Sequence, residues 1–190
     1  MKDVTLALAG RSPETRESRQ FLERLQASGA RVSYAQVDVA SRVDVQAFIN
    51  KVLKSAGQIH GIIHSAGVIQ DNFILKKPGR EFSEVLTPKV AGFVNLDEAT
   101  QDVDLDFFVT FSSGAAVAGN VGQADYAAAN AFMDAYATYR QRLVAAGRRR
   151  GRTLSINWPL WAEGACAPTP VRNRCFESAS GFLCSRNRRG

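Results

Sequence analysis

Cysteine is missing from most of this 190-residue chain: the first 164 residues contain none, and Cys166, Cys175 and Cys184 follow near the C-terminus. Their nine-residue spacing fits no zinc motif and no histidine accompanies them, so the sequence predicts no metal site. Long hydrophobic runs are missing too, and none approaches the roughly 20 apolar residues that cross a membrane. The apolar stretch 4–9 is too short for a secretory signal. We therefore expect a cytoplasmic protein without a membrane segment.

A glycine-rich turn of the form G-x-G-x-x-G is also missing. Dinucleotide-binding sheets open with a strand and such a turn, and their strand order 3-2-1-4-5-6 makes this first strand central. The strand that ends at Gly10-Arg11-Ser12 corresponds to the second strand of that order. We therefore expect a Rossmann-like sheet without its first strand. Its second strand would then face the fourth across a gap or pair with it directly.

Positive charge is concentrated in the tail. Of the formal net charge of +6, residues 165–190 contribute five arginines and one glutamate, a net +4. This tail has neither helical nor strand periodicity. One interpretation is a basic arm for metal or nucleic acid. We favour a poorly ordered extension, genuine or out of frame, with no nucleic-acid partner. The basic run 148–152 lies between a predicted helix and a predicted strand, which favours a solvated loop.

Strand-like and helix-like segments alternate through the rest of the chain. Strands are predicted at 4–9, 31–37, 59–64, 107–111 and 153–158, and helices at 13–29, 41–57, 81–100 and 123–146. Ser12 and Ser41 can cap the first two helices, with Pro13 at the first helical position, and Gly57 can end the second. The strand at 59–64 is apolar enough to be buried on both faces. The alternation predicts an α/β fold, a doubly wound parallel sheet with right-handed crossovers.

Three polar residues follow the strand at 107–111 at informative spacings. Ser113 lies just after the strand, Tyr126 thirteen residues later, and Asn130 four residues after that. Tyr126 and Asn130 would share one face of a helix. Open α/β sheets bind ligands where strand ends face helix starts. A hydroxyl and a phenol there can polarise a carbonyl and protonate it, which is reductase chemistry. Each residue taken alone is more typical of a turn or a core position.

Five short motifs follow one another along the chain: His64-Ser65-Ala66-Gly67, Pro88-Lys89-Val90, Phe111-Ser112-Ser113, Tyr126-Ala127-Ala128-Ala129-Asn130 and Asn157-Trp158-Pro159-Leu160-Trp161. In this order and at these spacings they resemble the ketoreductase domains of modular polyketide synthases, which belong to the short-chain dehydrogenase/reductase superfamily. The resemblance runs from about Val4 to Gly164, which predicts a ketoreductase-like domain over 1–164, N-terminally incomplete, followed by the tail at 165–190.

The resemblance implies a reaction and its partners. The family uses NADPH to reduce the β-keto group of an acyl chain carried on phosphopantetheine by an acyl carrier protein, among neighbouring synthase domains in polyketide or fatty-acid-type biosynthesis. The alternative is a non-catalytic, truncated domain that keeps the site residues but cannot hold NADPH.

The resemblance also assigns catalytic roles. Ser113 would stabilise the carbonyl oxygen and Tyr126 would donate the proton. Lys89 would place a cation near the phenol and hold the cofactor ribose. Asn130 would orient a water or a backbone group in the proton path. Ordinary single-domain relatives carry a lysine at the position of Asn130, so lysine and asparagine are exchanged here.

NADP(H) is the cofactor that the resemblance implies. Arg11 and Ser12 follow the second strand of the family order, and an arginine there accommodates the 2′-phosphate of NADP. Asp38 and Val39 match the family positions that contact adenine. The segment Ser65-Ala66-Gly67 matches the backbone beneath the nicotinamide ribose.

The loop after Gly67 carries a stereochemical signal. B-type members of the family have Leu-Asp-Asp where this chain has Ile69-Gln70-Asp71, and A-type members have a tryptophan where it has Ala118. The retained Asp71 and the missing tryptophan predict a B-type domain that forms a D-configured hydroxyl. Asp71 and Gln123 are the residues predicted to control substrate orientation.

Overall fold

The computed structural model describes residues 4–159, so the predicted tail at 165–190 and the last two residues of the Asn157–Trp161 motif lie outside the described residues. All the predicted strands and long helices are present, together with the short elements η1 and α4, which were not predicted. In chain order the elements are β1 (Thr5–Gly10), α1 (Arg16–Ala27), β2 (Arg31–Gln36), α2 (Arg42–Ala56), β3 (Gly61–His64), the 3₁₀ helix η1 (Ile74–Lys76), α3 (Gly79–Ala99), β4 (Phe107–Ser113), α4 (Ala115–Ala118), α5 (Ala124–Ala145) and β5 (Arg152–Trp158).

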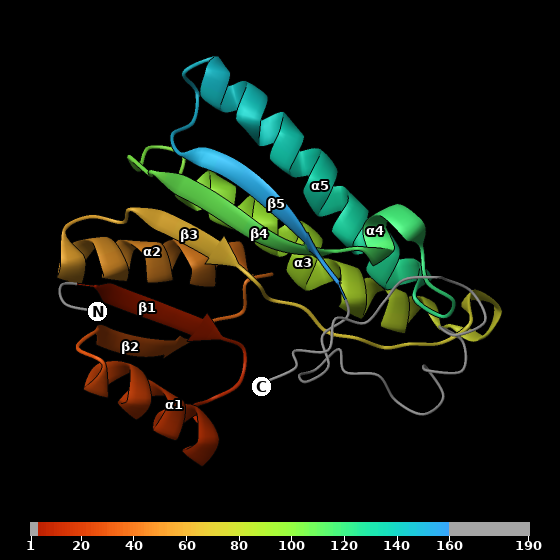
Figure 1. Ribbon diagram of the computed structural model, residues 1–190, viewed down its shortest axis with the longest axis horizontal. Coiled ribbons are helices and arrows are strands. Elements are labelled where there is room, and N and C mark those ends of the chain that lie inside the picture. The colour runs from red at the N-terminus through yellow and green to blue at the C-terminus, as the bar shows by residue number, and fades with distance from the viewer. Residues whose placement is uncertain (1–3, 160–190) are drawn as a thin grey trace, which may run out of the picture.

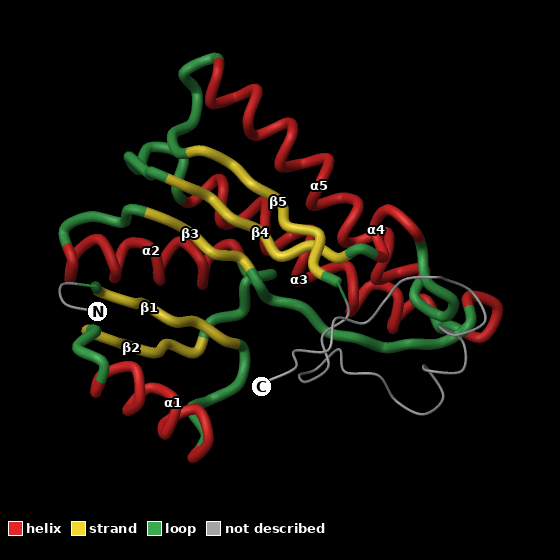
Figure 2. Tube along the Cα trace, viewed as in Figure 1, coloured by secondary structure: helices red, strands yellow, loops and turns green. Residues whose placement is uncertain are grey.

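The strands form two parallel sheets (Figures 1 and 2). β1 pairs with β2 in one sheet, and β3, β4 and β5 follow one another in the second. Within residues 4–159, β1 and β3 do not pair with each other. Of the two arrangements expected for the sheet, the structure therefore has the gap and not the direct pairing.

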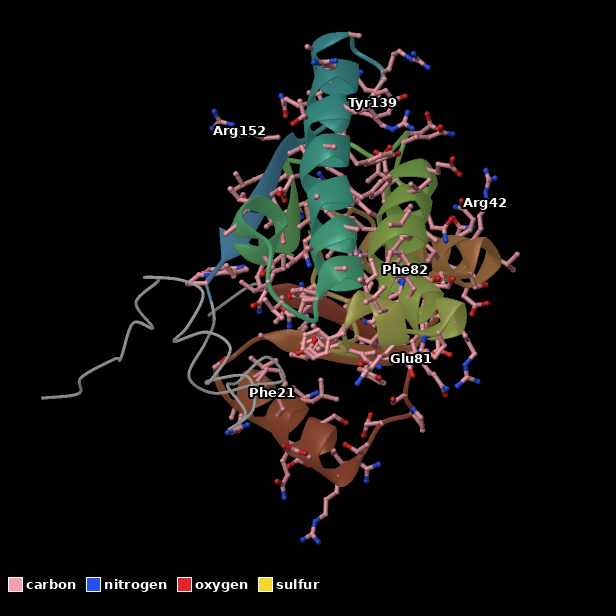
Figure 3. The ribbon with its side chains drawn as sticks, turned by 90° about the vertical axis from the view of Figure 1, so that its right-hand side faces the viewer. Phe21, Arg42, Glu81, Phe82, Tyr139 and Arg152 are labelled. Atoms are coloured by element: carbon pink, nitrogen blue, oxygen red, sulfur yellow. The ribbon has the colours of Figure 1, made fainter. Side chains whose placement is uncertain are left out.

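Helices lie on both sides of the strands, as the doubly wound fold requires. α2 and α3 lie behind the strands in Figure 1, and α3 packs along α5. The connection β1–α1–β2 leads to a strand on one side of the gap between β1 and β3, and the connection β3–α3–β4 leads to a strand on the other side. Because such crossovers are right-handed, α1 lies on the face opposite α3. In Figure 3, Tyr139 marks α5 and Phe82 marks α3, while Phe21 lies apart from both on α1.

The hydrophobic core lies between the three-stranded sheet and the helices α2, α3 and α5. At its centre the rings of Phe93 on α3 and Phe108 on β4 stack with centroids 5.0 Å apart. Both side chains are fully buried, and burying an aromatic side chain is one of the largest single contributions to folding. The other buried members are Val37, Val45, Ile49, Ile59, Leu96, Leu105, Met133 and Ala137.

The opposite face of the three-stranded sheet is open in the described part of the chain. Ile63 on β3 is 61% exposed and Leu154 on β5 is 52% exposed. Successive side chains of a strand point to opposite faces, so Ile62 and His64 face the core while Ile63 does not. The prediction that this strand is buried on both faces is therefore wrong: the helices that pack against the sheet cover one face.

The predicted start and end of α2 are confirmed. The hydroxyl of Ser41 accepts the backbone N–H of Asp44 at 3.2 Å, which satisfies one of the free donors of the first turn. Gly57 ends the helix with a φ of 78°, a conformation that side chains disfavour and glycine adopts freely.

Thr15, and not Ser12, caps α1. The side chain of Thr15 accepts the N–H of Ser18 at 3.1 Å, and the Ser18 hydroxyl accepts the N–H of Thr15 at 2.8 Å, which forms a reciprocal capping box. The prediction of a Ser12 cap with Pro13 at the first helical position is therefore wrong. The carbonyl of Ser12 instead accepts the hydroxyl of Tyr34 at 2.6 Å.

Candidate active site

The side chain of Lys89 lies where α3, β4 and α5 meet. It is 4% exposed, and its Nζ donates a hydrogen bond to the carbonyl oxygen of Phe111 at 3.1 Å. The same Nζ lies 5.5 Å from the centroid of the Tyr126 ring, in the first turn of α5. A cation this close to an aromatic ring is attracted by the ring electrons. The fold thus brings a lysine and a tyrosine, 37 positions apart in the sequence, into contact.

Ser113 is the last residue of β4, at the same end of the sheet. Its Oγ accepts the N–H of Ala115 at 3.2 Å, where α4 begins. A serine hydroxyl that accepts one hydrogen bond keeps its own hydrogen for donation. The preceding Ser112 donates to the backbone carbonyl of Asn130 at 3.3 Å, which fastens the end of β4 to α5.

Asn130 lies one turn after Tyr126 and is fully buried. Its Nδ2 donates to the backbone carbonyl of Tyr126 at 2.7 Å. Its Oδ1 is buried and has no hydrogen-bond partner among the described residues. Because buried polar atoms in folded proteins almost always have a partner, this oxygen marks a place for a water or another donor.

The segment that follows β3 passes directly beside Lys89. A Cβ placed on Gly67 would lie 3.0 Å from Cε of Lys89 and 3.5 Å from its Nζ, so a larger residue would press against the lysine. Ser65 is exposed and Ala66 is half-buried. Of the residues predicted to contact the cofactor, the segment Ser65-Ala66-Gly67 therefore lies next to the lysine–tyrosine contact.

Arg11 and Ser12 lie on the other sheet, in the exposed turn that follows β1. Gln36 donates from Nε2 to the carbonyl of Arg11 at 3.1 Å, and Tyr34 holds the carbonyl of Ser12. These contacts fix the backbone of the turn and leave the arginine side chain in solvent. Gln36 and Tyr34 were not predicted, since nothing in their spacing links β2 to this turn.

Asp38 and Val39 follow β2. Oδ1 of Asp38 accepts the N–H of Ala40 at 2.9 Å, which shapes the turn into α2. The carbonyl of Val39 accepts Nδ2 of Asn95 on α3 at 2.9 Å. The turn is therefore tied to the helix that carries Lys89.

His64, at the end of β3, is a buried neutral neighbour of the site. Burial, with a smaller contribution from the charge of Lys89, lowers the pKa of its imidazole to about 4. Its Nε2 has no hydrogen-bond partner within the described residues. An imidazole in this environment is uncharged at neutral pH.

Asp71 and Gln123 are brought together by the loop after β3. Nε2 of Gln123 donates to both carboxylate oxygens of Asp71, at 2.9 and 3.0 Å. Gln123 immediately precedes α5, so the contact joins the predicted substrate loop to the helix of Tyr126. Its Oε1 accepts Nδ2 of Asn120 at 2.9 Å, so the whole amide group is used.

Two residues of the site were not predicted from the sequence. Lys77 donates from Nζ to Oδ2 of Asp125, and both side chains are 1% exposed. Asp125 directly precedes Tyr126, which was a possible signal. The 48 positions between the two residues hide the pairing.

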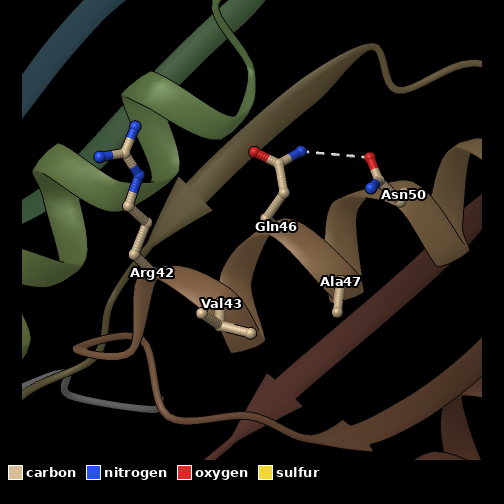
Figure 4. Close-up of a pocket in the computed structure, with 5 residues that line it drawn as sticks. All are labelled: Arg42, Val43, Gln46, Ala47 and Asn50. Atoms are coloured by element: carbon tan, nitrogen blue, oxygen red, sulfur yellow. Dashed lines mark hydrogen bonds between the residues drawn. The ribbon is translucent and has the colours of Figure 1, made fainter.

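A surface hollow lies along α2 and away from this cluster (Figure 4). In it Gln46 donates to Asn50 at 3.1 Å. Val43 at its edge is 77% exposed, so the hollow is open to solvent and offers no enclosed site.

Within residues 4–159, no three histidine, cysteine, aspartate or glutamate side chains come together as a metal site would require. None of the helices described is both long and apolar enough to cross a bilayer.

Residues 3–163 match the KR domain family. The chain belongs to that family. It is 42% identical over 189 residues to the polyketide synthase PksN of Bacillus subtilis (strain 168), a match that covers 100% of this chain and 3% of PksN. It is 51% identical over 154 residues to the polyketide synthase ThaG of Burkholderia thailandensis, covering 80% of this chain and 3% of ThaG. The chain therefore corresponds to one KR domain and spans only about 3% of the length of these polyketide synthases.

Solved structures agree with this assignment. A ketoreductase domain from the bacillaene assembly line superposes with a TM-score of 0.85 at 46% identity, covering 87% of this chain and 40% of that one. A ketoreductase from the macrolactin assembly line superposes with a TM-score of 0.79 at 47% identity, covering 83% and 32%. The chain therefore has the ketoreductase fold and spans less than half the length of these structures. The match to PksN covers the whole of this chain, whereas the match to the KR family ends at residue 163.

Proposed function

We propose that this KR domain, once a glycine-rich strand–turn–helix completes its sheet, reduces the β-keto group of an acyl chain carried by an acyl carrier protein, with NADPH as the reductant. The observation that carries the proposal is the contact between Lys89 and Tyr126. It places a buried ammonium against the phenol ring at the carboxyl ends of the strands, where α/β sheets bind their ligands. Ser113 ends the neighbouring strand.

Ser113, Tyr126 and Lys89 would each have a separate role in the reduction of the carbonyl. Bound NADPH would supply the hydride to the carbonyl carbon. The Ser113 hydroxyl would donate to the carbonyl oxygen and stabilise the negative charge that develops there. The Tyr126 phenol would deliver the proton, and the Lys89 ammonium beside it would stabilise the phenolate that remains. A water held at Oδ1 of Asn130 would return a proton toward this lysine and tyrosine.

Two features of the structure fit NADPH. Gly67 approaches Lys89 so closely that a Cβ there would lie 3.0 Å from Cε of the lysine, so glycine leaves the lysine side chain room to reach a ribose. The exposed Arg11 would meet the 2′-phosphate that distinguishes NADP from NAD. The sequence has no glycine-rich turn for the pyrophosphate, and the open edges of β1 and β3 are where a strand leading into such a turn would pair.

The cofactor test compares two proteins by NADPH fluorescence titration. One is the 190-residue chain, and the second carries a glycine-rich strand–turn–helix before Met1. We expect tight NADPH binding only in the extended protein, because the backbone N–H groups of such a turn bind the pyrophosphate. An extended protein that folds but does not bind NADPH would show that the gap between β1 and β3 is not the reason why the 190-residue chain fails to bind the cofactor.

The catalytic test follows NADPH oxidation by the extended protein with a β-ketoacyl pantetheine thioester. Tyr126→Phe removes the proton donor and should lower kcat roughly 10²- to 10⁴-fold while NADPH affinity stays unchanged. Tyr139→Phe, on the exposed face of the same helix, is the matched control and should keep the full rate. NADPH binding without turnover in the unsubstituted extended protein would contradict the proposed reaction. The alternative, a truncated domain that keeps the site residues but cannot hold NADPH, predicts instead that the 190-residue chain does not bind the cofactor.

Product stereochemistry tests the role proposed for Asp71 and Gln123. Chiral chromatography of the hydroxyacyl product should give the D-configured alcohol. Gln123→Ala breaks the contact to Asp71 and should lower the enantiomeric ratio. An L-configured product would overturn the B-type assignment.

A further inference from the structure

A buried ion pair that is not part of the proposed chemistry joins the loop between β3 and α3 to the first turn of α5. The side chains of Lys77 and Asp125 are each 1% exposed, and Nζ of Lys77 donates both to Oδ2 of Asp125 and to the carbonyl of Gln70. Removing two charges from water is costly, and the attraction between them compensates only when the geometry is good and other hydrogen bonds are satisfied. The pair therefore holds its surroundings in one arrangement.

The carboxylate of Asp125 links Lys77 directly to the backbone of Tyr126. Its Oδ1 accepts the backbone N–H of Tyr126 at 2.8 Å, while its Oδ2 binds Lys77. One carboxylate thus joins the side chain of the loop to the peptide group of the residue proposed to donate the proton. Asp125 also lies in the first turn of α5, where a negative charge is favourable to the helix dipole.

Two more contacts fasten the same loop to the start of α5. Asp71 accepts the amide of Gln123, and the backbone N–H of Asn72 donates to the carbonyl of Gly122 at 2.9 Å. Both contacts are made at the edge of the site, whereas Lys77–Asp125 is enclosed. The ion pair is the anchor of the set because it is the one whose partners are removed from water.

We propose that Lys77 and Asp125 are positioning residues that set the distance between the substrate loop, with Asp71, and the proton donor Tyr126. The proposal rests on the proposed function for its consequence in catalysis. Its structural part, the attachment of the loop to the start of α5, is independent of any cofactor. Neither residue touches the reacting atoms.

The attachment is tested by hydrogen exchange and mass spectrometry on the 190-residue chain. Lys77→Met keeps the length of the side chain and removes its charge. Exchange in segment 68–78 and in the first turn of α5 should become about tenfold faster or more, because these segments open together, while β4 and β5 keep their protection. Lys77→Arg restores the charge and should restore most of the protection.

Asp97→Asn is the matched control, since Asp97 also belongs to a fully buried ion pair, with Arg140, but outside this loop. It should loosen α3 and the far part of α5 and leave segment 68–78 protected. The proposal is wrong if Lys77→Met leaves the exchange of this segment unchanged, or if it accelerates every element to the same degree. Asp125→Asn gives the same comparison from the other partner if Lys77→Met does not fold.

The catalytic consequence is measured in the N-terminally extended protein. Lys77→Met should lower kcat roughly ten- to hundredfold, since a misplaced proton donor is costly, and should lower the enantiomeric ratio of the product. The KM for NADPH should change by less than about twofold, because neither Lys77 nor Asp125 is among the residues proposed to hold the cofactor. Unchanged kcat and enantiomeric ratio would overturn the positioning role. If the unsubstituted extended protein itself shows no turnover, the proposed function fails, and the exchange experiment still decides the attachment.

Discussion

Lys89 concentrates several functions in one buried side chain. Its ammonium binds the Phe111 carbonyl, approaches the Tyr126 ring, fills the space beside Gly67 and contributes to the lowered pKa of His64. A buried lysine is costly unless its charge is compensated. Its place at the strand ends, and not within the apolar core, is what favours a role in chemistry over one in stability.

Substituting Lys89 by methionine should separate these roles. Lys89→Met keeps the volume and removes the cation beside the phenol, so kcat of the extended protein should fall at least about a hundredfold through lost transition-state stabilisation. Lys54→Met removes an exposed lysine of α2 and is the control. Steady-state assays of both variants give the comparison, and equal rates would show that the lysine does not assist proton transfer.

His64 gives the protein a specific acid sensitivity. The unfolded chain binds a proton at its ordinary pKa near 6.5, whereas in the folded state burial and the charge of Lys89 lower the pKa to about 4. Between these values the unfolded state holds more protons, so stability falls as the pH drops through this window. The loss from pH 7 to pH 4.5 should be about 2–3 kcal/mol from this residue.

Urea unfolding at both pH values tests this. His64→Gln cannot titrate and should lose less stability on acidification than the unsubstituted protein. His60→Gln, at an exposed histidine four positions earlier, should retain the full acid sensitivity. Equal losses in His64→Gln and the unsubstituted chain would assign the effect to other groups.

At the scale of elements, one carboxylate joins α3, α5 and the segment before β5. Asp97 on α3 accepts from Nε of Arg140 at 2.7 Å, from Nε of Arg149 at 3.0 Å and from the hydroxyl of Tyr136 at 3.1 Å. Arg140 also donates to Thr153 on β5 at 2.7 Å. Burial, with a smaller contribution from the Asp97 carboxylate, raises the pKa of the Tyr136 phenol, which remains a hydrogen-bond donor across the physiological range.

Asp97→Asn should lower the free energy of unfolding by roughly 3–5 kcal/mol, because Arg140 would stay buried without its counter-charge. Glu98→Gln, the next residue of α3, breaks only the exposed pair with Arg42 and should cost less than about 1 kcal/mol. Urea denaturation of the two variants measures the difference. A cost for Asp97→Asn as small as that for Glu98→Gln would mean that the network adds nothing to the helix packing.

Features that depend on residues close together in the sequence could be predicted, and contacts between residues far apart in the sequence mostly could not. Elements set by local signals were found, such as α2 between its Ser41 cap and Gly57. Where two residues could cap the same helix, local signals were not enough: Thr15 and not Ser12 caps α1, because Ser18 completes a capping box with Thr15. The Lys89–Tyr126 contact was expected from family resemblance. Lys77–Asp125 and Asp97–Arg140 join residues more than 40 positions apart, and no pattern along the chain reveals such pairs.

At the scale of the whole molecule, the gap between the sheets and the open face of β3 have one explanation. A parallel strand inserted between β1 and β3, and followed by a helix leading into β1, would cross in the same direction as β1–α1–β2. Because crossovers are right-handed, this helix would lie on the side of α1, opposite α3. Ile63 points to that side. The same inserted unit would therefore complete the sheet and cover its exposed apolar residues.

Ile63→Lys tests this geometry, since its cost should depend on the context. In the 190-residue chain Ile63 is 61% exposed, so the substitution should change stability by less than about 0.5 kcal/mol. In the protein extended by a strand–turn–helix, the lysine would be buried beneath the new helix and should cost at least about 2 kcal/mol. Val43→Lys on the outer side of α2 is the control and should cost the same in both proteins. Urea denaturation of the four variants gives the comparison. If Ile63→Lys costs the same with and without the extension, the added helix does not pack on this face, and the split sheet is closed in some other way.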